Sequence, residues 1–159
     1  MSTPSSSPVP AGATAIITGG SRGLGFEVAA GLAAQGYHVA LIAKDPQGLA
    51  QAREKLIAEF PQCSVSTFAI DFEVTTPTVL DRARQQLAEV RSSIATPTAL
   101  VIAHAVMSEK MSKTLRTSDA EWRRVLAINL DSTFMVVNEL VPPMAEARAG
   151  RVVIFSACL

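Results

Sequence analysis

The residues in this sequence most able to do chemistry form a glycine-rich loop near its amino end. Gly19, Gly23 and Gly25 follow a run of small apolar and β-branched residues and open an apolar run at 26–34. The first glycine can turn where a side chain would clash, the second lets backbone approach an anion, and the third lets a helix lie close to a strand. Because the unpaired N–H groups at a helix start attract anions, the loop is predicted to bind phosphate groups. A tight turn without a ligand is the simpler alternative.

A strand before this loop and a helix after it must position the glycines. Residues 13–18 have the pattern of a buried strand, and residues 26–34 have that of a helix. The spacing Gly19-x-x-x-Gly23-x-Gly25 differs from the common G-x-G-x-x-G pattern, and no Gly-Lys-Ser/Thr follows it as in a P-loop. The loop nevertheless ends the first strand and opens a helix, which is the context in which dinucleotides are bound.

Further strands and helices follow in alternation along the sequence. Helix starts are indicated by Asp45 before Pro46, by Thr76 before Pro77, and by the capping box that Ser118 begins. Apolar or alternating runs predict strands at 37–43, 64–70, 99–106 and 150–157. Such alternation predicts an α/β fold, a doubly wound (Rossmann) and mostly parallel sheet of order 3-2-1-4-5 with right-handed crossovers.

Two cations are placed to meet a phosphorylated ribose. In dinucleotide folds the end of the second strand faces the adenosine ribose, where an acid accepts hydrogen bonds from a 2′-hydroxyl and a cation accommodates a 2′-phosphate. Lys44 stands at this place after Ala43, and Arg22 adds a second positive charge in the glycine loop. These residues predict NADP(H) as the cofactor. The alternative is that Lys44 and Arg22 are solvated surface charges.

A polar side chain, Asn129, falls on the predicted inward stripe of the helix that follows Ser118. A buried amide without partners costs roughly 1 to 3 kcal/mol, so its presence among apolar neighbours indicates a specific role. The alternative is an amide that bonds a nearby backbone carbonyl. The other positions predicted to face inward are Trp122, Val125 or Leu126, Thr133, and Val136 or Val137.

Composition excludes several function classes. With 159 residues, 48% of them hydrophobic, the sequence is long enough for one domain with a real core. Its 14 basic and 14 acidic residues cancel, so nothing global points to nucleic acid or to a membrane surface. Cys63 and Cys158 lack metal-ligand spacing, and we expect thiols in a reducing compartment and no metal site. Residues 1–12 form a Ser/Pro-rich segment, expected to be a disordered tail of a cytoplasmic protein whose domain spans 13–159.

The segment Thr18-Gly19-Gly20-Ser21-Arg22-Gly23-Leu24-Gly25 resembles the cofactor loop of the short-chain dehydrogenase/reductase family, and the likeness extends from about Ala13 to the end of the sequence. It implies that Gly19, Ser21, Arg22, Gly23, Leu24 and Gly25 bind the cofactor. It also implies that Asp71 and Phe72 meet the adenine, although a turn or helix-cap acid explains Asp71 nearly as well. NADP-preferring members often carry Arg where Lys44 stands, and the family's counterpart of Asn129 helps to hold a water in a proton relay.

Two segments depart from the family pattern. Residues 103–106 read Ala-His-Ala-Val where the family usually has Asn-Asn-Ala-Gly. His104 there is either a hydrogen-bonding substitute for an asparagine or a packing residue. In the fifth strand the family's catalytic serine falls on Ala157, and Ser156 is its neighbour. Because a shift of one residue reverses the face of a strand, no catalytic role is assigned to Ser156.

The family's proton donor is a tyrosine assisted by a lysine four residues later, whereas the single tyrosine here, Tyr37, has no lysine at that offset. We therefore expect the cofactor-binding half of the fold, truncated after the fifth strand, and no activity of this chain by itself. The resemblance implies reduction of a ketone or aldehyde by the complete enzyme. The segment around Trp122 and Asn129 is similar to the 3-oxoacyl-thioester reductases, which implies an acyl-thioester substrate.

A different class of function is a non-catalytic NADP(H)-binding or subunit-capturing product. Family members commonly associate through the helix that corresponds to the one holding Asn129, which implies a homo-oligomer. The fifth strand is also expected to be a sheet edge, and apolar edges invite pairing with other chains. A methyltransferase has a comparable glycine-rich loop but needs an acid near Lys44 for the ribose hydroxyls, so it is the weakest alternative.

Overall fold

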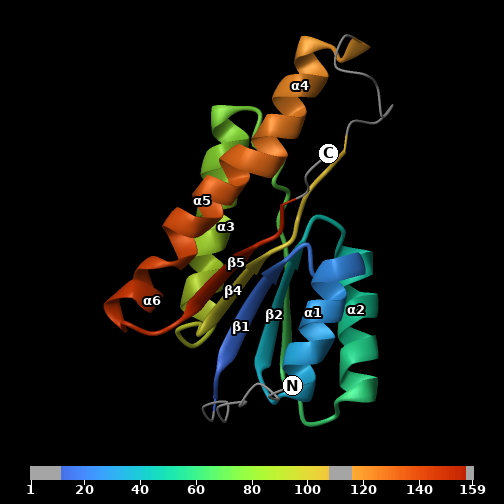
Figure 1. Cartoon of the computed structure of the whole chain (residues 1–159), viewed down its shortest axis with the longest axis vertical. Helices are drawn as coiled ribbons and strands as arrows, with labels where there is room; N and C mark the ends of the chain where they lie inside the picture. The colour runs from blue at the N-terminus through green and yellow to red at the C-terminus, as the bar shows by residue number, and fades with distance from the viewer. Residues whose placement is uncertain (1–11, 108–115, 157–159) are drawn as a thin grey trace, which may run out of the picture.

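The computed structural model describes residues 12–107 and 116–156, which form a parallel five-stranded sheet with helices on both faces (Figure 1). The strand order β3-β2-β1-β4-β5 confirms the predicted topology. The predicted tail, apart from Gly12, lies outside the described residues, as do Ala157 and Cys158. The strands are β1 Thr14–Thr18, β2 His38–Ala43, β3 Val65–Ala69, β4 Ala99–Ile102 and β5 Arg151–Ile154.

The predicted helix starts are confirmed by side-chain caps. Asp45 accepts a hydrogen bond from the Gln47 N–H at 3.0 Å, and Ser118 accepts one from the Glu121 N–H at 3.2 Å. Thr76 accepts from the Val79 N–H at 3.4 Å. The helices are α1 Gly23–Ala34, α2 Pro46–Glu59, α3 Pro77–Ser93, α4 Asp119–Leu126, the π-helical turn η2 Ala127–Asp131, α5 Ser132–Leu140 and α6 Pro142–Glu146.

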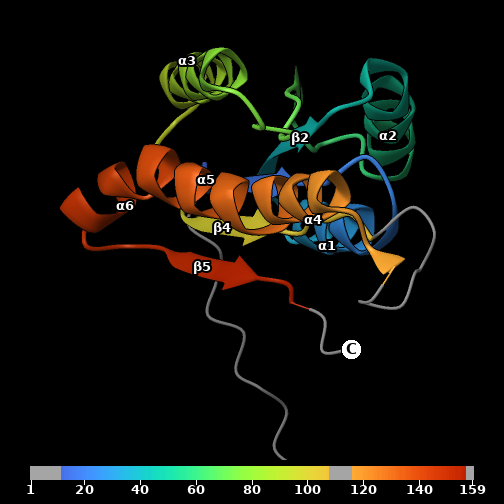
Figure 2. The same ribbon diagram turned by 90° about the horizontal axis from the view of Figure 1, so that it is seen from above.

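Each face of the sheet has its own apolar layer. Successive side chains of a strand point to opposite faces, so Ile16 packs in one layer and Ile17 in the other. The first layer lies under α3 and α5, and the second lies under α1 and α2, as the view in Figure 2 shows. The central strands are therefore covered on both sides, which explains their continuous apolar sequences.

The fourth strand is shorter than predicted, because pairing stops at Ile102 rather than continuing to 106. Its last sheet contacts are the bonds from Ala103 N–H to the Thr18 carbonyl oxygen, at 3.1 Å, and from Phe155 N–H to the Ile102 carbonyl oxygen, at 2.9 Å. Beyond Ala103 the neighbouring strands offer no further partner, and the chain leaves the sheet.

The helix after Ser118 is not the single regular helix on which the prediction of inward-facing residues was based. The turn η2 divides it into α4 and α5, and a π-helical turn inserts a residue that rotates the following helix face. The buried positions are consequently Ala127, Ile128, Ser132, Met135, Val136 and Leu140. The prediction of Trp122 and Asn129 as inward residues was wrong. Trp122 is 55% exposed, and Asn129 is also exposed.

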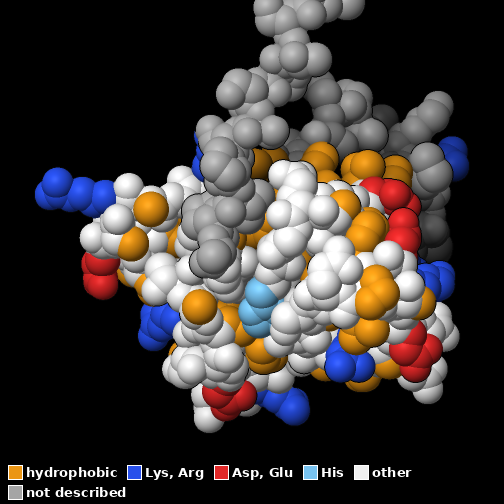
Figure 3. Space-filling view, turned by 90° about the horizontal axis from the view of Figure 1, so that it is seen from below, with side chains coloured by type: hydrophobic (Ala, Val, Ile, Leu, Met, Phe, Trp, Pro, Cys, Tyr) orange, Lys and Arg blue, Asp and Glu red, His pale blue; other side chains and the backbone are white. Residues whose placement is uncertain are grey.

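The face of the molecule seen from below Figure 1 mixes charges of both signs with scattered apolar side chains (Figure 3). The amino ends of the strands lie at this end of the sheet, opposite the glycine-rich loop. Among the helices of the described ranges, none combines the length and the apolar character needed to cross a membrane.

Candidate functional site

Backbone contacts hold the glycine-rich loop against the neighbouring strands. Gly19 and Gly20 donate their N–H groups to the Ile42 carbonyl oxygen at 2.8 and 3.3 Å. Gly19 has a φ of 68°, and a Cβ added there would lie 2.8 Å from the Ala103 carbonyl carbon and from the His104 nitrogen. Because this position has neither the conformation nor the space for a side chain, the loop turns directly against the chain that leaves β4.

The start of α1 leaves backbone N–H groups free for an anion. Its first hydrogen bond runs from Phe26 N–H to the Arg22 carbonyl oxygen at 3.4 Å. In the described part of the chain, no bond occupies the N–H groups of Gly23, Leu24 or Gly25. These groups lie at the positive end of the helix dipole, where phosphate oxygens bind.

The glycines also leave space in front of these N–H groups. A Cβ added at Gly25 would collide with the Gly19 carbonyl oxygen, whereas one at Gly23, where φ is 58°, would meet nothing within 4 Å. The loop is therefore packed tightly where Gly25 meets Gly19, and it is open next to Gly23. Among the described residues, no atom occupies the space next to Gly23, which is compatible with a diphosphate group bound there.

The other predicted residues of the loop face outward. Arg22 and Leu24 are exposed, and Ser21 is half-buried beside the start of α2. Within residues 12–107 and 116–156, Arg22 makes no ion pair, so its charge remains available to a bound anion. The structure thus brings all the predicted loop residues to one end of the sheet.

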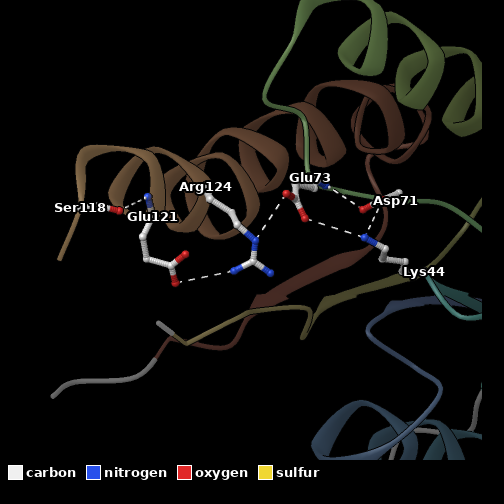
Figure 4. A network of polar contacts seen from close by, with 6 residues as sticks. All are labelled: Lys44, Asp71, Glu73, Ser118, Glu121 and Arg124. Carbon is white, nitrogen blue, oxygen red and sulfur yellow. Dashed lines mark hydrogen bonds and ion pairs between the residues drawn. The ribbon is translucent and has the colours of Figure 1, made fainter. Parts of the chain in front are cut away.

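Lys44 and Asp71 meet at the ends of β2 and β3 (Figure 4). The Lys44 Nζ lies 2.8 Å from the Asp71 Oδ2 and 3.8 Å from the Glu73 Oε2. The hydrogen bond to Asp71 raises the pKa of Lys44 above its ordinary value. Asp71 also accepts a hydrogen bond from the Glu73 N–H at 3.0 Å, which is the turn role left open as an alternative. Contacts of these residues with ribose and adenine remain predictions.

Glu73 extends this network to α4. The Arg124 Nε lies 3.4 Å from the Glu73 Oε1, and the Arg124 Nη1 lies 3.7 Å from the Glu121 Oε1 (Figure 4). Sequence reasoning missed Glu73 and Arg124, because no local pattern shows which charges meet across about fifty residues. The network ties the adenosine side of the predicted site to the helix that begins at Asp119.

Phe72 does not present its ring to a ligand. The side chain is only 5% exposed, and its ring stacks on that of His104 with the centroids 4.3 Å apart and the planes at 30°. The predicted contact of Phe72 with adenine would therefore be made through its backbone. The ring itself belongs to the layer under α3 and α5.

His104 lies between β1 and α5. Its Nδ1 is 2.6 Å from the Thr18 Oγ1, and its Nε2 is 2.6 Å from the Ser132 Oγ. Burial lowers the pKa of His104 to about 4, so the ring is neutral at pH 7. The ring both forms hydrogen bonds and packs on Phe72, so both interpretations of His104 describe part of what is seen, and its equivalence to the family's asparagine stays a prediction. Thr18 and Ser132 were not singled out, since a hydroxyl in an apolar run carries no signal of its partner.

Asn129 binds the backbone of the segment that leaves β4. Its Oδ1 accepts from the Val106 N–H and its Nδ2 donates to the Val106 carbonyl oxygen, both at 2.9 Å. The alternative of backbone bonding is therefore seen, and the residue is exposed rather than buried. Asn129 lies on the π-helical turn η2, a distortion frequent at functional sites. Its catalytic role stays a prediction.

Two residues considered for catalysis lie at opposite ends of the sheet. Ser156 is exposed after the end of β5. Tyr37 is half-buried directly before β2, at the opposite end of the sheet from the glycine-rich loop. Tyr37 is therefore remote from the predicted phosphate site. Ser156 lies at the carboxyl edge of the sheet, directly after Phe155, whose N–H bonds the Ile102 carbonyl oxygen.

Comparisons with known proteins agree with this geometry. The family profile described as short chain dehydrogenase matches residues 13–158. A 3-oxoacyl-[acyl-carrier-protein] reductase of Staphylococcus epidermidis is 28% identical over 140 residues, which are 88% of this chain and 54% of that protein. The chain thus spans about half the length of the curated relatives it matches.

Solved structures share the fold. A metagenomic short-chain oxidoreductase in complex with NADP superposes with a TM-score of 0.81 at 23% identity, covering 93% of this chain and 62% of the other. The L-sorbose reductase from Gluconobacter frateurii, complexed with NADPH and L-sorbose, gives a TM-score of 0.74 at 28% identity, covering 91% of this chain and 52% of that protein.

Proposed function

This chain belongs to the short-chain dehydrogenase/reductase family, and we propose that it binds NADP(H) at the carboxyl end of its sheet. The observation that carries the proposal is the open start of α1, where the N–H groups of Gly23, Leu24 and Gly25 have no other partner in the described chain. The diphosphate binds there, and Ser21, a residue of the glycine-rich loop that lies close to the start of α2, adds a hydroxyl donor.

The phosphorylated cofactor is preferred over NAD(H) because of charge. Both cations are exposed. Arg22 directly precedes α1, and Lys44 lies two residues before α2. Ala43, which precedes Lys44, offers no carboxylate to a 2′-hydroxyl. The NADPH complex of the 28% identical L-sorbose reductase supports this preference. Asp71 orients the Lys44 ammonium group and lies beside the adenine, with the Phe72 backbone next to it.

The complete protein reduces a ketone or aldehyde group with hydride from this cofactor. The 3-oxoacyl reductase relatives support a 3-oxoacyl thioester as its substrate class. Asn129, bonded to the Val106 backbone, holds the water of a proton relay in that reaction. Because Tyr37 is the single tyrosine and lies at the far end of the sheet, these 159 residues bind the cofactor without reducing a carbonyl.

A second function, capture of a related subunit, is favoured by an exposed apolar face on the helix that carries Asn129. Leu130 and Phe134 are 60% and 68% exposed. They line a hollow of about 420 Å³ together with Leu80 of α3 and Met135. Size-exclusion chromatography of the chain alone, and mixed with a full-length relative, tests this function. Elution of both proteins as unchanged monomer-sized species would contradict it.

Titration with NADPH and with NADH tests the cofactor proposal. NADPH is expected to bind at least about tenfold more tightly than NADH, a difference of about 1.4 kcal/mol. Lys44→Ala is expected to weaken NADPH binding about fivefold while leaving NADH binding unchanged, because an exposed cation contributes about 1 kcal/mol. Lys55→Ala, at an exposed position of α2, is the matched control and should change neither affinity. Equal binding of both cofactors, or binding of neither, would contradict the proposal.

A further inference from the structure

The segment that leaves β4, residues 103–106, is held at both of its ends. The Ala103 N–H donates to the Thr18 carbonyl oxygen at 3.1 Å and lies 3.3 Å from the Thr18 Oγ1. At the other end, the Asn129 side chain holds the Val106 backbone through two bonds of 2.9 Å. Gly19 turns against this segment so closely that a Cβ would clash with it. Residues 103–106 therefore limit how the glycine-rich loop can be placed, because Gly19 packs directly against their backbone.

The hydrogen bonds around His104 assign one tautomer to its ring. The Ser132 hydroxyl donates its proton to the Ile128 carbonyl oxygen at 2.6 Å, so the Ser132 Oγ accepts from His104 Nε2–H. The Thr18 Oγ1, which accepts from the Ala103 N–H, donates its own proton to the His104 Nδ1. A neutral ring with the proton on Nε2 satisfies every partner. Burial favours the same state, since it lowers the pKa of His104.

Each residue that the His104 ring contacts is close in sequence to a predicted site residue. Thr18 precedes Gly19 at the end of β1, and Phe72, on which the ring stacks, follows Asp71. Ser132 lies one residue after η2, the turn that holds Asn129. A residue that only fills space would not need two fully buried hydroxyl partners on separate elements.

We propose that His104 is a positioning residue of the cofactor site. Its neutral ring joins the end of β1, the start of α5 and the Phe72 ring, and so holds residues 103–106, against which the glycine-rich loop turns. This inference rests on the proposed NADP(H) function for its effect on binding. In this proposal His104 acts through Thr18 and residues 103–106. The two ring nitrogens of His104 thus connect β1, through Thr18, with α5, through Ser132.

The variant His104→Phe tests this inference, because it keeps an aromatic ring for the stack on Phe72 and removes both nitrogens. We expect it to raise the NADPH dissociation constant at least tenfold. His38→Phe is the matched control. His38 also loses a bond to a serine hydroxyl, the 3.0 Å contact from its Nε2 to the Ser66 Oγ, but it lies at the opposite end of the sheet.

Both variants should lower the midpoint of thermal unfolding, because His104→Phe removes two part-buried hydrogen bonds and His38→Phe removes one. Only His104→Phe should weaken NADPH binding, whereas His38→Phe should stay within twofold of the wild type. NADPH binding by His104→Phe within twofold of the wild type would overturn the inference, and so would equal weakening by both variants. If His104→Phe does not fold, Ser132→Ala removes one of its two bonds, and unchanged NADPH affinity in that variant would likewise overturn it.

Hydrogen exchange without cofactor separates this inference from the proposed function. Peptides that cover Gly19–Gly25 and residues 103–106 should exchange at least fivefold faster in His104→Phe than in the wild type, and at the wild-type rate in His38→Phe. Absence of NADPH binding by the wild type would overturn the proposed function alone, since the exchange rates would still decide the role of His104. Unchanged exchange in His104→Phe would overturn the positioning role whatever the cofactor affinity.

Discussion

The strands β1 and β5 belong to one sheet and have similar residue types, yet their surroundings are opposite. Every residue of β1 is at most 1% exposed, whereas Val152, Val153 and Ile154 of β5 are 41% to 50% exposed. β1 pairs with β2 and β4 and is covered by helices on both faces. Among the strands of the described ranges, β5 pairs with β4 alone and ends the sheet.

This difference teaches that valine and isoleucine predict a strand but not how much of it is covered. The glycine-rich loop follows the fully covered strand, so the predicted phosphate site adjoins a strand that is buried on both faces. The edge strand carries no predicted cofactor residue, and its outer side pairs with no strand within residues 12–107 and 116–156. Changes in β1 are therefore expected to alter stability, and changes in β5 to alter association.

The same substitution in both strands gives the largest expected contrast. Ile17→Ala should lower the free energy of unfolding by about 2 to 5 kcal/mol, since it opens a cavity in the layer under α1 and α2. Ile154→Ala removes the same atoms from a half-exposed side chain and should cost about 1 kcal/mol or less. Urea unfolding of the two variants and the wild type measures both values. Equal losses would show that the edge strand is covered in solution.

Acid should weaken the part of the molecule around β1 through His104. The unfolded His104 titrates near its ordinary pKa of 6.5 and the folded one near about 4, so the unfolded state binds the extra proton between these values. The contribution of this group is complete above pH 6.5 and is lost as the pH falls to about 4, about 3 kcal/mol in total. Urea unfolding at pH 7.5 and pH 4.5 measures the loss.

His104→Gln is the control for this pH dependence, because it keeps polar groups and does not titrate. Burial also lowers the pKa of His38, which adds pH dependence of the same sign, so the difference between wild type and variant isolates His104. An identical fall in stability for both proteins would contradict the assignment.

A smaller effect is expected at the first residue of β1. The Thr14 side chain is 1% exposed, and its hydroxyl has no hydrogen-bond partner among the residues that the structure describes. Thr14→Val should therefore raise the free energy of unfolding by about 1 kcal/mol, since it removes a buried polar group of similar shape. Thermal unfolding would show the rise, and Thr98→Val, whose hydroxyl donates to the Thr14 carbonyl oxygen, should not reproduce it.

The smallest change in stability is expected at the edge. Val153→Lys should change the free energy of unfolding by no more than about 0.5 kcal/mol, because the side chain is half-exposed. A lysine on an edge strand discourages pairing with other chains, so self-association at high protein concentration should decrease. Sedimentation velocity compares the two proteins. A loss of stability comparable to that of Ile17→Ala would contradict the exposed environment of β5.

Local signals in the sequence were sufficient for most of the fold. Asp45, Thr76 and Ser118 cap the helices that they were predicted to cap, because a cap depends on residues within one helical turn. The strand order followed from alternation and crossover handedness. The stripe was right at Val136, which is buried, and wrong at Trp122 and Asn129. The π-helical turn η2, which changes the face at Asn129, leaves no mark on the apolar pattern.

For the candidate site, the sequence indicated the local backbone but not the contacts between distant side chains. The conformations of Gly19 and Gly23 followed from glycine itself, since few other residues adopt a positive φ. The pairing of Lys44 with Asp71, and the pairing of Glu73 with Lys44 and Arg124, were not predictable. Each of these contacts joins segments distant in sequence, and any exposed charge has many possible partners.

The sequence by itself determined the order of strands and helices, their caps and the open turn before α1, because these depend on short-range stereochemistry. Only the tertiary structure decided that the His104 ring lies between Thr18, Ser132 and Phe72, and that the Asn129 amide holds the Val106 backbone. A hydrogen bond needs its two atoms within about 3 Å, and packing alone brings such distant residues that close.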